Sequence, residues 1–178
     1  YPGAKLVSYD PATGQLADHG RMDEGEQYAR VIAAGDDGWV YTGIGMVRGN
    51  IVGFNTATGE HRSMLADAER AAGCGDVYRG EDGKVYGSLG GQRYRLWEGV
   101  PTKIKEEERA GMRMHTLKDG RTLLDSGIHD YYELHDPATG EKQRFAPKYA
   151  GAGSMVFVVG QGPRGLIFGG SAVPLSMW

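Results

Sequence analysis

Arginine side chains stand out among the groups that could recognise a ligand in this chain of 178 residues. A planar guanidinium group binds a carboxylate, sulfate or phosphate through two parallel hydrogen bonds. We therefore predict that Arg30, Arg48 and Arg113 bind the acidic groups of an oligosaccharide or polysaccharide. Acidic residues occupy the same segments of the sequence, so solvated ion pairs are the alternative interpretation of any one arginine.

Tyrosine and histidine side chains provide candidates for proton transfer. We predict that Tyr28, His115 and His129 are catalytic residues, because a tyrosine or a neutral histidine can remove the proton next to a uronate carboxylate. An arginine would neutralise the enolate that develops. This chemistry is a β-elimination. The alternative for each residue is a structural role, as a packed aromatic ring or a hydrogen-bonded histidine.

The spacing of the candidate ligand residues does not match a known metal-binding or cofactor-binding motif. His129 and His135 are six residues apart, which fits no common zinc motif, and Cys74 is the only cysteine. Residues 87–91 are rich in glycine, but no Lys-Ser pair follows them, so a phosphate-binding loop is not expected. We predict no metal and no cofactor.

The charge balance excludes some classes of partner. Lys and Arg number 20 and Asp and Glu number 23, which gives a net charge of −3, without the basic surplus typical of nucleic-acid-binding proteins. The sequence contains no apolar run of the length that a membrane helix needs, so no membrane partner is expected. The cellular compartment stays undetermined.

A turn motif recurs along the chain. Residues 10–14, 55–59 and 136–140 read DPATG, NTATG and DPATG, and the first two copies are 45 residues apart. A second series, Asp37-Gly38, Asp82-Gly83, Asp119-Gly120 and Arg164-Gly165, has spacings of 45, 37 and 45. Asp or Asn bonds to its own following backbone and Gly accepts positive φ, so both series are typical of tight connections between strands.

This period predicts an all-β fold, a β-propeller with about four blades of four antiparallel strands in a single domain. The repeats fall at roughly 1–28, 29–72, 73–110, 111–150 and 151–178, of which the last is partial. The third repeat is the least regular, because Trp97-Glu98-Gly99 replaces the DPATG turn. We expect the chain to be part of a seven- or eight-bladed propeller, or a ring that a partner chain or further blades complete.

The blade pattern also predicts which face carries function. Strands are named a to d from the axis outward, so the a-to-b and c-to-d turns share one face. The d-to-a and b-to-c connections share the other, and their variable lengths favour it as the ligand face. Short helical turns are predicted within 64–72 and 106–109. The following residues of equivalent b-strand position should be buried between blades: Tyr41, Tyr86, Leu123 and Phe168.

The segments 6–14 and 37–43 resemble blades of seven-bladed propellers of the quinoprotein-like, kelch-like and polysaccharide-lyase-like kind. The resemblance spans nearly the whole chain, and it implies a carbohydrate-active protein, a lyase or glycosidase acting on uronate-containing oligosaccharide, in an extracellular or periplasmic location. No catalytic motif of such a family is matched. The alternative function is a non-catalytic propeller that binds a glycan or a protein as a scaffold.

Overall fold

A computed structural model describes residues 3–125, 132–145, 156–161, 167–172 and 175–177. The chain forms two compact units, residues 1–110 and 111–178, and the division falls at the predicted boundary between the third and fourth repeats. Across the described ranges, no helix has both the length and the apolar character needed to cross a membrane.

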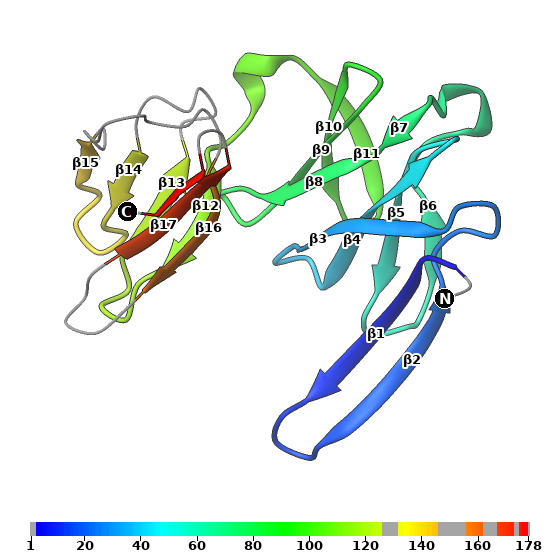
Figure 1. The fold of residues 1–178 in the computed structure, drawn as a ribbon, viewed down its shortest axis with the longest axis horizontal. Helices are drawn as coiled ribbons and strands as arrows, with labels where there is room; N and C mark the ends of the chain where they lie inside the picture. The colour runs from blue at the N-terminus through cyan, green and yellow to red at the C-terminus, as the bar shows by residue number, and fades with distance from the viewer. Residues whose placement is uncertain (1–2, 126–131, 146–155, 162–166, 173–174, 178) are drawn as a thin grey trace. The chain divides into compact units, whose positions relative to one another are not determined.

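The first unit is built from short antiparallel strands that follow one another along the chain (Figure 1). Its elements are β1 Lys5–Asp10, β2 Gln15–Arg21, β3 Tyr28–Ala34, β4 Trp39–Met46, β5 Asn50–Asn55, β6 His61–Ser63, the 3₁₀ turn η1 Asp67–Glu69, β7 Gly73–Cys74, β8 Asp76–Arg79, β9 Val85–Leu89, β10 Gln92–Trp97, β11 Val100–Ile104 and the 3₁₀ turn η2 Glu106–Glu108. The two 3₁₀ turns lie where the sequence predicts helical turns.

These strands form one two-stranded sheet and two sheets with the predicted a-b-c-d order. The pair β1-β2 supplies c and d strands, β3-β4-β5-β6 forms a complete blade, to which β7 adds at the end of β4, and β8-β9-β10-β11 forms the next blade. The irregular third repeat is therefore a complete blade. A two-residue turn joins β10 to β11 there, with Glu98 and Gly99 at φ values of 51° and 70°.

The second unit repeats the same pattern. Its strands are β12 Met112–Thr116, β13 Thr122–Asp125, β14 Tyr132–His135, β15 Lys142–Phe145, β16 Val156–Gln161, β17 Ile167–Ala172 and β18 Leu175–Met177. The first four form a sheet in chain order, and the last three form a second sheet in chain order. Consecutive antiparallel neighbours are what a propeller blade requires.

The recurring turn motif closes the c-to-d connection by the same bonds in each copy. The side-chain Oδ1 of Asp10, Asn55 and Asp136 accepts the backbone N–H two residues later at 2.8, 2.9 and 2.9 Å. The glycine that ends each copy has a φ of 72–74°, which a residue with a Cβ adopts at a cost. Local chemistry therefore sets these connections.

The core lies between blades, as the b-strand pattern predicts. Tyr41, Tyr86 and Leu123 are buried, which confirms their predicted position, whereas Phe168 lies in β17, where only the backbone is described. The Tyr41 hydroxyl donates to Asp37 Oδ2 at 2.8 Å and accepts the Gly99 N–H at 3.0 Å. This contact ties the a-to-b turn of one blade to the c-to-d turn of the next.

Tyr86 bonds to the aspartate of its own a-to-b turn, as Tyr41 does, and this bond makes the stability of the fold depend on pH. Its hydroxyl donates to Asp82 Oδ2 at 3.0 Å, and burial, together with that carboxylate, raises the pKa of Tyr86 to about 12. Because the folded-state pKa lies above the ordinary value of 10.0, the phenol's contribution to stability is complete below pH 10 and is lost as the pH rises towards 12. We expect Tyr86→Phe to flatten this alkaline decline, measured by urea unfolding across the pH range. An unchanged alkaline decline in the variant would contradict the assignment.

Candidate functional site

An open pocket of about 480 Å³ lies in the first unit, where three connections of the predicted ligand face meet. They are the d-to-a connection 22–27, the b-to-c connection 47–49 and the d-to-a connection 64–72. The pocket is lined by Asp23, Glu24, Gly25, Glu26, Val47, Arg48 and Arg70. Its volume is in the range of small-molecule sites.

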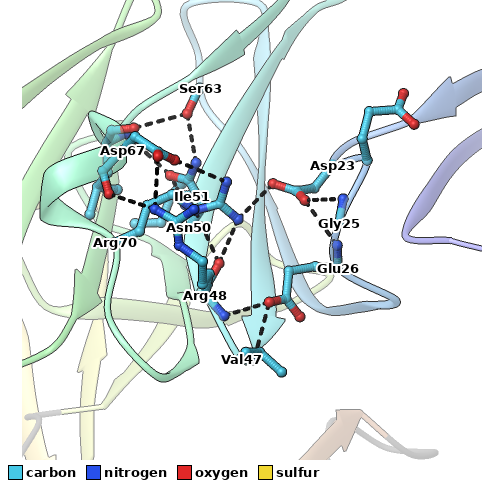
Figure 2. A network of polar contacts seen from close by, with 12 residues as sticks. Asp23, Gly25, Glu26, Val47, Arg48, Asn50, Ile51, Ser63, Asp67 and Arg70 are labelled. Atoms are coloured by element: carbon cyan, nitrogen blue, oxygen red, sulfur yellow. Dashed lines mark hydrogen bonds and ion pairs between the residues drawn. The ribbon is translucent and has the colours of Figure 1, made fainter.

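Glu26 is the most buried charged residue of the pocket, with 6% of its surface exposed. Its Oε1 atom accepts the backbone N–H of Val47 at 3.1 Å and also that of Arg48 (Figure 2). Two neighbouring peptide N–H groups that converge on one oxygen form an anion-binding concavity, and the carboxylate of Glu26 fills it. Connection 22–27 is thereby attached to the end of β4.

Arg70 joins the three connections. Its Nη2 atom lies 2.8 Å from Asp23 Oδ2, and both side chains are largely buried, at 14% and 9% exposure. Its Nε atom donates to the backbone oxygen of Arg48 at 3.1 Å. The other carboxylate oxygen of Asp23 accepts the N–H groups of Gly25 and Glu26 at 2.8 and 2.9 Å. This ion pair therefore holds connections 22–27 and 64–72 together at the pocket.

Arg48 makes a more exposed ion pair on the other side of the pocket. Its Nη2 atom lies 2.8 Å from Asp67 Oδ2, with 53% and 75% of the two side chains exposed. The hydrogen bond from Arg48, followed by its charge, lowers the pKa of Asp67 below the ordinary value. Since both side chains face solvent, this pair adds little to stability. The guanidinium of Arg48 is more accessible than that of Arg70.

A buried amide, that of Asn50, fixes the start of connection 64–72, which carries the pocket residue Arg70 (Figure 2). Asn50 donates to Ser63 Oγ at 2.6 Å, and its Oδ1 atom accepts the N–H of Leu65 at 3.2 Å. Asn50 is almost fully buried at the start of β5, so these bonds set where connection 64–72 leaves the sheet.

The predicted site residues fall in both units. Arg48 lines the pocket. Tyr28 is 63% exposed at the start of β3, directly after connection 22–27, and Arg30 follows on the same strand. Arg30 occupies an irregularity in the β3-β4 register, between the pairs that Ala29 and Val31 make, and such bulges are frequent beside active sites.

The remaining predicted residues lie elsewhere. Arg113 and His115 are partly buried on β12 in the second unit, and His129 lies outside the described residues. Arg113 and His115 flank Met114, which occupies a register irregularity like that of Arg30. That these residues share one site with Tyr28 and Arg30 stays a prediction.

Sequence reasoning did not select Glu26, Asp23 or Arg70 as site residues. Each acts through partners far along the chain, 21 to 47 residues away, and no local motif marks them. Among the residues that the structure describes, no three His, Cys, Asp or Glu side chains gather closely enough to hold a metal ion.

Comparisons with known proteins bear on the fold. No family model and no curated protein matches the sequence. Solved structures do match: an inactive variant of virginiamycin B lyase from Staphylococcus aureus with quinupristin has a TM-score of 0.54 at 10% identity, over 99% of this chain and 63% of that chain. A streptogramin B lyase gives 0.48 at 12% identity, over 99% and 62%, and a proposed gluconolactonase gives 0.44 at 15%, over 94% and 64%.

The chain therefore spans less than two thirds of the length of the structures that it matches. Identities of this size carry the fold and not the activity. Together with the chain-ordered antiparallel sheets, the match to the virginiamycin B lyase structure leads to one conclusion: this chain has the all-β propeller fold that its repeats predict.

Proposed function

We propose that this chain belongs to a carbohydrate-active propeller and binds its sugar in the pocket between connections 22–27, 47–49 and 64–72. The observation that carries this proposal is the pocket itself, which places fixed carboxylate and guanidinium groups beside exposed apolar surface. Ion-pair groups can bind sugar hydroxyls, and the exposed side chain of Val47, which lines the pocket, offers apolar surface to a sugar ring. A seven-bladed ring, of which this chain would be a part, belongs to the same proposal.

The backbone amides of Val47 and Arg48 report on this site. We expect oligosaccharide binding to shift the NMR signals of these two amides, because both bond to Glu26 at the base of the pocket. The amides of Ala12 and Ala57, in turns of the opposite face, serve as the control and should stay in place. Sugars that leave the Val47 and Arg48 signals unchanged would overturn the proposal.

A narrower form of this function is β-elimination from a uronate, and the exposure of Tyr28 and Arg30 on β3 favours it. Tyr28 would take the proton next to the carboxylate. The electrons of that C–H bond form the new C=C bond as the bond to the glycosidic oxygen breaks, and the departing oxygen receives the proton that Tyr28 removed, while Arg30 or Arg48 neutralises the enolate. The product carries a conjugated double bond.

This chemistry predicts an ultraviolet signal from glucuronan or polygalacturonate that grows with time. Tyr28→Phe should lower the rate about a hundredfold or more, the usual size of a general acid–base effect. Because the Tyr28 side chain is exposed, the melting temperature of the variant should stay unchanged. If sugar binding shifts the NMR signals of the pocket amides but no unsaturated product forms, the protein is a binding scaffold. This is the second function that the sequence allows.

A further inference from the structure

The charges in the pocket are unequally compensated. Arg70 is paired with Asp23 at 2.8 Å and Arg48 with Asp67 at 2.8 Å, so both guanidinium groups already have carboxylate partners. Glu24 lies 3.6 Å from Arg21 and is 92% exposed. Glu26 has no cationic partner among the described residues; its contacts are backbone N–H groups.

Glu26 also has an unused acceptor. Both of its side-chain hydrogen bonds end on Oε1, and Figure 2 shows its second oxygen turned away from them, without a contact. Within the described part of the chain, no hydrogen bond or ion pair reaches Oε2, and this oxygen is not fully buried. Glu26, which is nine-tenths buried and lines the pocket, thus has one carboxylate oxygen without a protein partner.

We propose that Oε2 of Glu26 binds the ammonium group of the ligand, and that the pocket takes a hydroxylated amine such as an amino sugar rather than a uronate. An ammonium group supplies both the charge and the hydrogen-bond donors that Glu26 lacks. A carboxylate ligand would meet an uncompensated negative charge and two guanidinium groups already bonded to Asp23 and Asp67. This assignment rests on the proposed sugar binding in that pocket, and it is an alternative to the uronate form of that function.

Three trisaccharides with one linkage and one differing substituent test the assignment: β-1,4-linked glucosamine, glucose and glucuronate. They are titrated at slightly acidic pH, where the amine is protonated and the carboxylates are ionised. We expect the glucosamine trisaccharide to bind most tightly to the unmodified chain, by NMR shifts at the Val47 and Arg48 amides.

Glu26→Gln is the informative variant. Its amide oxygen can still accept the two backbone N–H groups, while an N–H₂ group replaces Oε2 and removes the acceptor and the charge. We expect glucosamine-trisaccharide affinity to fall about tenfold or more, the equivalent of one charged hydrogen bond. Glu107→Gln changes the net charge equally from an exposed position outside the pocket, and we expect less than a twofold effect.

The outcomes separate the two proposals. If no trisaccharide shifts the pocket amides, the proposed function fails and this assignment fails with it. If glucuronate binds best, or if Glu26→Gln and Glu107→Gln weaken glucosamine binding equally, the pocket still binds sugar but Glu26 is not the ammonium site. Retained chemical-shift dispersion in Glu26→Gln shows that any loss of binding is not a loss of fold.

Discussion

Gly43→Ala should lower the free energy of unfolding by about 3 kcal/mol or more. A Cβ at Gly43, in the middle of β4, would lie 2.0 Å from the backbone oxygen of Gly75 and 2.8 Å from a methyl group of Val31. The Gly75 N–H donates to the Ile44 oxygen at 3.0 Å, so the two backbones are held together where the methyl group would go. Urea unfolding followed by circular dichroism measures the loss.

Gly25→Ala is the matched control for that substitution. The nearest atom to its added Cβ is Asp23 Oδ1 at 3.6 Å, an ordinary van der Waals contact, so we expect a change of less than about 1 kcal/mol. Similar losses for the two variants would mean that β4 can move away from Gly75, and that close backbone approach does not hold these strands.

Arg70→Ala should cost about 3 kcal/mol, because it leaves the buried carboxylate of Asp23 without its cation and removes the bonds to the Arg48 backbone. The loss should also loosen connection 22–27, since Asp23 organises the Gly25 and Glu26 amides. Urea unfolding gives the stability change, and hydrogen exchange at those two amides gives the local effect.

Arg48→Ala provides the comparison within the same pocket. Its ion pair with Asp67 is exposed, so we expect a loss of less than about 1 kcal/mol. The double variant Asp23→Ala with Arg70→Ala should be less damaging than the sum of its single variants, because no buried charge is left alone. Additive single effects would show that the Asp23–Arg70 pair is not the element that holds the pocket.

The sequence predicts the turns of this protein from local motifs. The Asp or Asn at the start of each c-to-d turn bonds to a backbone N–H two residues later, and the closing glycine takes a positive φ. Both effects act within five residues, so the repeat predicts the strand connections, the b-strand positions of Tyr41 and Tyr86, and from them the propeller fold. The third blade was harder to predict because Glu98-Gly99 makes a shorter turn without the motif.

The candidate site depends on contacts that no local pattern encodes. Arg48 was predicted from its residue type and its place in a b-to-c connection, and it does line the pocket. Glu26 and Arg70 acquire their roles only when connections 22–27, 47–49 and 64–72 meet, because their partners lie 21 to 47 residues away. Sequence alone determined the blades and grouped the b-to-c and d-to-a connections, where the candidate pocket lies, on one face. Tertiary structure decided which guanidinium groups are already paired and which carboxylate has no cationic partner among the described residues, because charge compensation depends on distances across separate connections.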